Sequence, residues 1–218
     1  MRAAPDYDEP VVWAYAAGVL IEKLTKGAAD KKIAAHFHEW LSGAGLLYLK
    51  KNNAKAATVF TTHATILGRT LASSNVDLYN VWDKINPDQE VYKYGIESKH
   101  LVEKNSAAFA DVFTTVSEIT GMEAQYLLKK KPDVLLPNGL DINKFPSFEE
   151  IVIKHKLQRD RVREFMLYYF FPYYTFDPKE TLIYFLAGRY EFHDKGIDIY
   201  IRALGKLNEK MRQAKTKK

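Results

Sequence analysis

Four short apolar runs recur along this sequence, each ending in a polar or glycine-bearing turn. They are KIAAHF (residues 32–37), AATVFTT (Ala56–Thr62), DVFTTV (residues 111–116) and DVLL (residues 133–136). Runs that are apolar without clean alternation are typical of parallel strands buried on both faces. Because helical patterns separate them, the sequence predicts an α/β fold with a doubly wound parallel sheet.

Helix signals lie between these runs. We expect one helix to open at Ser42, a second over HATILGR, and a third from the N-cap Ser117 to Lys130, before the stop at Pro132. Residues 76–110 are aromatic-rich and largely helical in pattern, with a break at Pro87.

Residues 148–170 place apolar side chains at approximate helical spacing among many charges, which predicts an amphipathic helix. A fifth apolar run, TLIYFL, reads as a buried strand that starts at Thr181 and precedes a helix near Gly196. We therefore place a boundary between two sheet domains between Pro137 and Glu180.

Composition narrows the class of protein. With 218 residues, of which 47% are hydrophobic, the chain can bury a real core. It has no cysteine, which excludes disulfides and thiolate metal sites. The N-terminus is acidic and proline-bearing, unlike a signal peptide, and no apolar stretch reaches the roughly 20 residues that cross a bilayer. We expect a cytoplasmic protein without a membrane association.

The formal net charge of +5 does not indicate nucleic-acid binding. Residues 202–218 hold seven cations and one acid, so the rest of the chain is close to neutral. A basic end of this kind is more often a solvated helix face than a binding arm. We therefore expect no nucleic-acid partner.

Polar side chains gather where the predicted strands end. In open α/β sheets ligands bind at the carboxyl ends of the strands. The residues at those positions are His36, His38, Glu39, His63, Arg69, Asn138, Arg189 and Lys195. These are the candidate site residues.

The stretch AGRYEFHDKG suggests an anion site. Arg189 and Lys195 lie six residues apart across a turn, and a guanidinium fork with an ammonium suits the two phosphates of a diphosphate. A helix starting near Gly196 would add the positive end of its dipole. The alternative is that Arg189 pairs with Glu191 or Asp194 at the surface, since the stretch is not the phosphate loop G-x-x-x-x-G-K-[ST].

The histidines leave several interpretations open. His63 directly follows a strand, where it either contacts substrate or fills a structural role. His36 and His38 are alternate residues of one strand and point the same way, and histidine is a common metal ligand. No further ligands are spaced convincingly. Structural or substrate-orienting hydrogen bonds are therefore favoured over a metal site. No G-x-S-x-G motif occurs, which weighs against a serine hydrolase.

Four longer stretches together carry a family resemblance. HFHEWLSGAGLLYLK, VFTTHATILGRTLASSNVDLYN, VFTTVSEITGMEAQYLLKKKPDVLLPNGLDINKF and FLAGRYEFHDKGIDIYIRAL resemble glycogen synthases of the eukaryotic type, glycosyltransferase family three, over roughly residues 35–204. The resemblance implies a GT-B fold of two Rossmann-like domains. It also implies transfer of glucose from UDP-glucose to the non-reducing end of an α-1,4-glucan, with retention of configuration and without a cofactor or a metal.

The resemblance also implies roles for single residues. Arg189 and Lys195 match residues that grip the donor diphosphate, and Arg69 matches an arginine on the donor side of the cleft. His63 matches a histidine beside the transferred glucose, and Asn138 matches a residue near the donor site at the hinge. His38 and Glu39 belong to a motif that lines the same cleft, and they receive a supporting role.

Domain limits and partners follow from the same resemblance. Residues 1–136 would belong to the N-terminal Rossmann-like domain, residues 137–180 to a hinge and helical insertion, and residues 181–218 to the start of the nucleotide-binding domain. The 148–170 insertion would form subunit contacts in a homo-oligomer. The expected partners are UDP-glucose and glycogen or another α-1,4-glucan, with glycogenin as a further candidate.

Family members are several hundred residues long, and the segment that carries their catalytic glutamate has no match here. We therefore expect an internal portion of a synthase that is inactive alone. The competing interpretations are a noncatalytic glucan-binding or subunit-interaction protein and a different GT-B glycosyltransferase.

Overall fold

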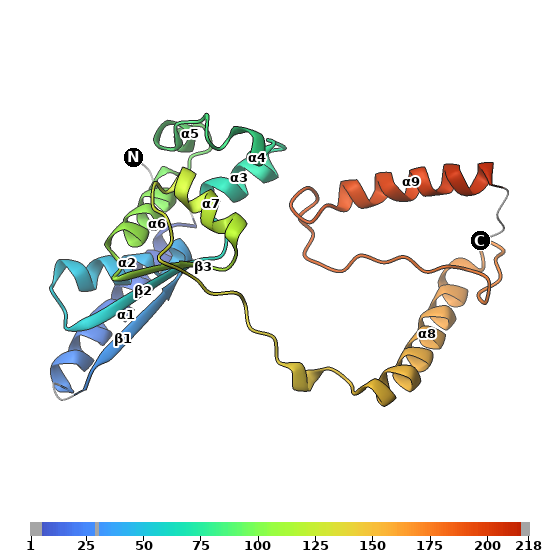
Figure 1. Cartoon of the computed structure of the whole chain (residues 1–218), viewed down its shortest axis with the longest axis horizontal. Coiled ribbons are helices and arrows are strands. Elements are labelled where there is room, and N and C mark those ends of the chain that lie inside the picture. The colour runs from blue at the N-terminus through green and yellow to red at the C-terminus, as the bar shows by residue number, and fades with distance from the viewer. Residues whose placement is uncertain (1–5, 29–30, 215–218) are drawn as a thin grey trace. The chain divides into compact units, whose positions relative to one another are not determined.

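The computed structural model describes residues 6–28 and 31–214, which form two compact units, Met1–Asn138 (unit 1) and Gly139–Lys218 (unit 2). The elements of unit 1 are α1 (Asp8–Gly27), β1 (Ile33–His38), α2 (Glu39–Lys51), β2 (Ala56–Thr62), α3 (Ile66–Ser73), α4 (Leu78–Val81), α5 (Pro87–Lys93), α6 (Glu97–Phe109), β3 (Val112–Thr115), α7 (Glu118–Leu127) and β4 (Val134–Leu135). Those of unit 2 are η1 (Ile142–Lys144), α8 (Phe148–Phe170) and α9 (Ile197–Gln213) (Figure 1).

Unit 1 is built on a four-stranded parallel sheet in the order β1-β2-β3-β4, flanked by helices (Figure 1). All four predicted runs form these strands, and the α/β class with a parallel sheet is confirmed. In register, His38 lies opposite Thr61, and Thr61 lies opposite Thr114. The carboxyl ends of neighbouring strands therefore meet at one edge of the sheet. The order runs in one direction over the described strands, so the reversal that defines a doubly wound sheet is not among them.

One face of the sheet holds the main core of unit 1. Alternate strand residues point to opposite faces, so Phe37, Phe60 and Phe113 share the buried face, where the rings of Phe60 and Phe113 stack 6.0 Å apart. Leu46 of α2 and Ala107 of α6 belong to the same core. The opposite face carries the exposed residues His36 and His38 on β1.

Three predicted helix limits are wrong. The helix expected over HATILGR begins only at Ile66 and continues to Ser73, because the Thr65 side chain caps it. α2 begins at Glu39 rather than at Ser42, because His38 is an extended N-cap residue and the helix follows the strand directly. α7 starts after the predicted N-cap Ser117 but ends at Leu127 rather than at Lys130, because Lys129 has a positive φ of 58° that terminates the helix. Pro87, expected as a break, is the first residue of α5.

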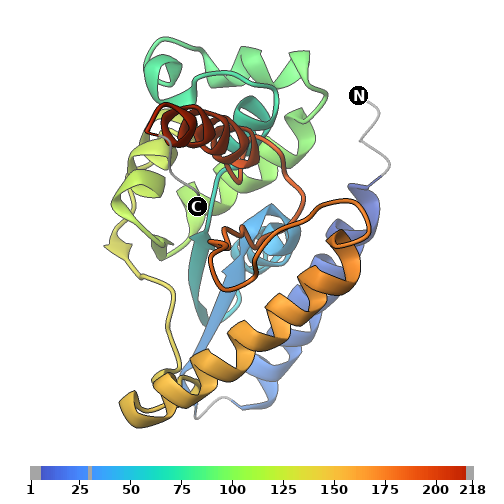
Figure 2. The same cartoon turned by 90° about the vertical axis from the view of Figure 1, so that its right-hand side faces the viewer.

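Unit 2 confirms the helix over Phe148–Phe170, which starts with a capping box between Ser147 and Glu150. α9 starts directly after Gly196, as expected. The strand predicted to start at Thr181 is wrong, because residues 181–187 form no regular structure. A strand needs a neighbour for its backbone hydrogen bonds, and the described part of unit 2 contains no strand. Figure 2 shows this stretch as an irregular trace between α8 and α9.

A membrane-spanning helix must be both long and apolar. Within residues 6–28 and 31–214, no helix combines the length and the apolar character that crossing a bilayer requires.

Candidate functional site

The ends of β1 and β2 bring three predicted site residues together. His38 ends β1, Glu39 opens α2 and His63 follows β2. The His38 Nδ1 and His63 Nε2 atoms lie 3.3 Å apart, within hydrogen-bond distance, and the rings of His36 and His38 lie with their centroids 4.1 Å apart. His36, His38 and His63 thus form one row of imidazoles, although His38 and His63 are 25 positions apart in the chain.

Glu39 binds the backbone of His63. Its Oε1 atom accepts a hydrogen bond of 2.9 Å from the His63 amide. Glu39 adopts a positive φ of 60°, which is uncommon for a residue with a side chain and costs on the order of 1 kcal/mol. Strained residues of this kind concentrate at functional sites. The strained turn directs the Glu39 carboxyl across to the neighbouring strand.

The surroundings of His38 favour the uncharged form of its ring. Burial lowers the pKa of His38, and the neighbouring His36 and His63 lower it further. A neutral ring has one donor and one acceptor nitrogen, which suits the contact between His38 and His63. His36 Nε2 lies 2.6 Å from the Thr61 hydroxyl. The His36 ring thus forms a structural hydrogen bond with the neighbouring strand. Among the described residues, no group of three or more His, Cys, Asp or Glu side chains is placed to hold a metal ion.

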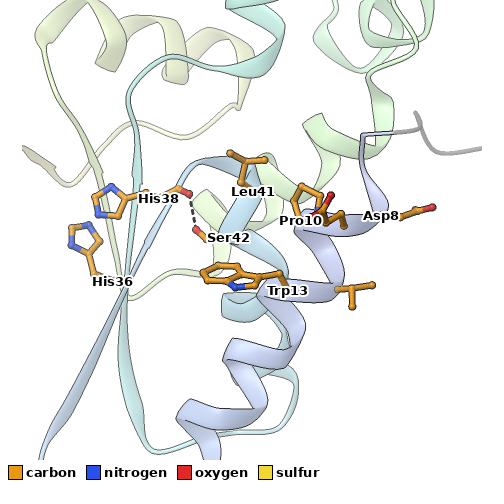
Figure 3. Close-up of a pocket in the computed structure, with 9 residues that line it drawn as sticks. Asp8, Pro10, Trp13, His36, His38, Leu41 and Ser42 are labelled. Carbon is orange, nitrogen blue, oxygen red and sulfur yellow. Dashed lines mark hydrogen bonds between the residues drawn. The ribbon is translucent and has the colours of Figure 1, made fainter.

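A hollow of about 1020 Å³ borders the two histidines of β1. Figure 3 shows His36 and His38 on one side of it and Trp13 of α1 facing it, with the Ser42 hydroxyl donating to the His38 carbonyl at 2.6 Å. Apolar side chains such as Trp13 and Leu41 line this hollow together with the two imidazoles.

Two buried carboxyls behind the His63 turn are functional candidates that the sequence analysis did not identify. Glu103 of α6 is fully buried, and Glu123 of α7 is 6% exposed. Glu103 Oε1 lies 2.9 Å from the Thr62 hydroxyl, and Glu103 Oε2 accepts a hydrogen bond of 2.9 Å from the Ile66 amide. A signal existed in the sequence, because Glu103 falls at helical spacing among residues that are buried on α6.

Burial changes the ionisation of both carboxyls. It raises the pKa of Glu103 to about 8, and the nearby Glu39 and Glu123 carboxyls act in the same direction. Burial also raises the pKa of Glu123, while the Arg69 charge opposes that rise. Glu103 is therefore held in its protonated form at neutral pH.

A pH dependence of stability follows for Glu103. Its carboxyl ionises near pH 4.5 when unfolded but keeps its proton to a pKa of about 8 in the fold. Between these values the folded state binds a proton that the unfolded state has released, so the free energy of unfolding falls as pH rises and levels off above about pH 8. The Glu103→Gln variant cannot ionise at this position. Relative to it, the free energy of unfolding of the wild-type chain should fall by at most about 5 kcal/mol over this pH range.

Urea unfolding at a series of pH values measures this difference. Trp13, Trp40 and Trp82 all lie in unit 1, so tryptophan fluorescence reports on that unit alone. Taking the difference between the two proteins cancels the groups that titrate in both. A difference that stays constant between pH 4.5 and pH 8 would contradict a neutral, buried Glu103.

Two further predicted site residues lie apart from this cluster. Arg69 is exposed on α3, and its charge acts on Glu123. Asn138 is exposed beyond β4 as the last residue of unit 1. In the described part of the chain, neither side chain forms a hydrogen bond with His38 or His63.

In unit 2, Arg189 and Lys195 face the same carboxylate. Arg189 Nη2 lies 3.1 Å from Glu191 Oε1, and Lys195 Nζ lies 3.8 Å from Glu191 Oε2. The surface ion pair that the sequence left open is thus present, and both cations lie within reach of one anion. Both side chains are exposed beside the start of α9.

The chain is similar to known proteins over nearly its whole length. The family described as Glycogen synthase matches residues 3–218. The chain is 43% identical over 211 residues to "Glycogen [starch] synthase" of Dictyostelium discoideum, covering 96% of this chain and 24% of the relative. It is 45% identical over 187 residues to "Glycogen [starch] synthase isoform 2" of Saccharomyces cerevisiae, covering 85% of this chain and 26% of the relative. It is 43% identical over 196 residues to the human "Glycogen [starch] synthase, liver", covering 90% of this chain and 28% of the relative.

The chain thus spans between about a quarter and a third of the length of these curated relatives. The family match covers nearly all of the chain, including every candidate site residue. This chain belongs to the glycogen synthase family.

Proposed function

We propose that this chain is part of a glycogen synthase that transfers glucose from UDP-glucose to the non-reducing end of an α-1,4-glucan with retention of configuration. The observation that carries this proposal is the identity of 40–45% to glycogen synthases over most of the chain. The polar cluster at the carboxyl ends of β1 and β2, where α/β sheets bind ligands, supports the same function.

Each part of the site has a task in this reaction. Arg189 and Lys195 bind the donor diphosphate and stabilise the negative charge that develops on the departing UDP. Arg69 approaches the donor, and Asn138 lies near it at the hinge. His63 lies beside the transferred glucose, where its ring or carbonyl steadies the cation-like transition state.

His38 and Glu39 support this arrangement by holding His63. His38 contacts the His63 ring, and the Glu39 carboxyl binds the His63 amide. Neither needs to touch substrate for this task.

The proposed architecture is a GT-B enzyme with two Rossmann-like domains. Residues 1–136 belong to the first, residues 137–180 form the hinge and helical insertion, and residues 181–218 start the second. The exposed apolar side chains of α8, among them Ile151, Val162 and Phe165, support subunit contacts in a homo-oligomer. The proposal includes a cytoplasmic location, glycogenin as a partner, and groups outside these 218 residues that complete catalysis.

The experiment that tests this function uses a complete synthase containing this segment. We expect it to incorporate labelled glucose from UDP-glucose into glycogen, with an α-configured linkage visible by NMR of the product. The isolated 218-residue chain is the matched control, and it should show no incorporation. A folded, complete protein without UDP-glucose transfer would refute the proposal.

A further inference from the structure

Three carboxyls from three helices bind the turn that presents His63. The turn, residues 62–66, is named the His63 loop here, and Glu39, Glu103 and Glu123 form the carboxyl cluster. We propose that Glu103 and Glu123 are positioning residues for glucosyl transfer, because with Glu39 they fix the backbone of the His63 loop. This inference rests on the proposed function, in which His63 lies beside the transferred glucose.

Each carboxyl of the cluster binds a different backbone amide of the loop. Glu39 Oε1 accepts from the His63 amide at 2.9 Å, and Glu123 Oε1 accepts from the Thr65 amide at 2.7 Å. Glu103 Oε2 accepts from the Ile66 amide at 2.9 Å. The carboxyls lie 24, 58 and 37 positions from the amides they bind, so tertiary structure rather than local turn chemistry fixes this loop.

The hydrogen-bond geometry around Glu103 suits a protonated carboxyl. The Thr62 hydroxyl lies 2.9 Å from Glu103 Oε1 and 3.2 Å from the Ala64 carbonyl, and a hydroxyl has only one proton to donate. When Glu103 carries a proton, it donates to the Thr62 oxygen, and Thr62 donates to Ala64. Glu103 Oε2 remains free to accept from Ile66. Every polar atom of this group then has a partner.

Glu123 is built into the start of α3. Its Oε1 atom accepts from both the amide and the hydroxyl of Thr65, and the same hydroxyl accepts from the Gly68 amide at 3.0 Å. A Cβ atom on Gly68 would overlap the Glu123 carboxyl. The space that a side chain at position 68 would fill is thus occupied by the group that binds the loop.

Capping of α3 alone does not account for the cluster. The Thr65 side chain already caps α3. The Glu103 and Glu123 carboxyls are desolvated, and burial together with the nearby Glu39 carboxyl raises the pKa of both, which is an unfavourable arrangement for stability. Holding a reacting group in place accounts for the arrangement, since a misplacement of about 1 Å can cost a factor of about 100 in rate.

The test compares two variants of Glu103 in the full 218-residue chain by amide hydrogen exchange. Glu103→Gln keeps a donor for Thr62 and an acceptor for Ile66, so exchange of the His63, Thr65 and Ile66 amides should stay within about twofold of wild type. Glu103→Leu removes both contacts, and exchange of these amides should accelerate at least about tenfold.

His100→Leu is the matched control. His100 is also fully buried on α6, and neither ring nitrogen has a hydrogen-bond partner in the described part of the chain. Its replacement should leave the loop amides unchanged. Equal acceleration in His100→Leu and Glu103→Leu would overturn the proposal, because general loosening of α6 would explain both. If Glu103→Leu does not fold, the unbranched substitution Glu103→Met removes the same two contacts, and unchanged exchange of the Ile66 amide would then overturn the proposal.

Kinetics of a complete synthase supply the functional readout. Glu103→Leu should lower kcat at least about tenfold while the KM for UDP-glucose stays within about threefold, and Glu103→Gln should keep most of the wild-type kcat. Accelerated exchange with an unchanged kcat would overturn the positioning role. Failure of the wild-type protein to use UDP-glucose would refute the proposed function instead, and the exchange result, measured without substrate, would still show whether Glu103 holds the loop.

Discussion

Arg189→Ala in a complete synthase is expected to lower kcat/KM for UDP-glucose at least about tenfold, and the double variant with Lys195→Ala about 100-fold. A charge-assisted hydrogen bond contributes about 1.5–3 kcal/mol, and each 1.4 kcal/mol corresponds to about a tenfold change. Both cations face the Glu191 carboxylate, at 3.1 Å and 3.8 Å. We expect the donor diphosphate to compete with Glu191 for these cations.

The position of α9 adds to this expectation. Gly196 is its N-cap, with a φ of 66°, and the first helical residue, Ile197, lies two positions after Lys195. The N-terminus of a 17-residue helix favours an anion through its dipole. Two cations and a helix start therefore lie together in a stretch of eight residues, 189–196.

Steady-state kinetics with varied UDP-glucose measure the effect. Arg202→Ala is the matched control, because Arg202 is an exposed arginine of α9 that pairs with Asp198. It should change kcat/KM by less than about twofold, as expected for a surface ion pair. Wild-type donor kinetics in a folded Arg189→Ala protein would contradict the assignment of Arg189 to the diphosphate.

The sequence was sufficient to predict the sheet and its polar edge. Ala56–Thr62 forms β2 with the expected limits, because a run of branched and aromatic residues between polar segments specifies a buried strand. Since parallel strands end at one edge, the contact of His38 and Glu39 with His63 follows from their places after β1 and β2.

Other features depend on what the chain packs against. Residues 181–187 have the pattern of a strand, but a strand forms only beside a partner. Glu123 resembles an ordinary helical glutamate in sequence. For both Glu103 and Glu123, the backbone amides that they bind are set only by the packing of α6 and α7 behind the His63 loop. The helix α1 was not predicted, because the acidic, proline-bearing start of the chain conceals it.

Gly68→Ala is expected to have the second large effect, because it removes the space that the Glu123 carboxyl fills. A Cβ at position 68 would overlap this carboxyl and approach the Thr65 hydroxyl at 2.8 Å. Alanine is otherwise favoured over glycine within a helix by about 1 kcal/mol, so a loss of stability must come from displacement of Glu123. We expect a net loss of about 1–3 kcal/mol in the free energy of unfolding of unit 1.

The same substitution should slow the reaction. A displaced Glu123 releases the Thr65 amide and hydroxyl, so the His63 loop loses one of its three attachments. In a complete synthase, kcat should fall at least about tenfold. Urea unfolding followed by tryptophan fluorescence measures the stability, and glucose incorporation into glycogen measures kcat.

Gly27→Ala separates the overlap from a general effect of replacing glycine. Gly27 is the last residue of α1, and a Cβ there meets no atom within 4 Å. This variant should lose no stability relative to the wild type and should keep its kcat. If Gly68→Ala behaved like Gly27→Ala in both measurements, the close packing of Glu123 against α3 would be refuted. A loss of stability with an unchanged kcat would instead limit Glu123 to a structural role, because the loop would then present His63 correctly without it.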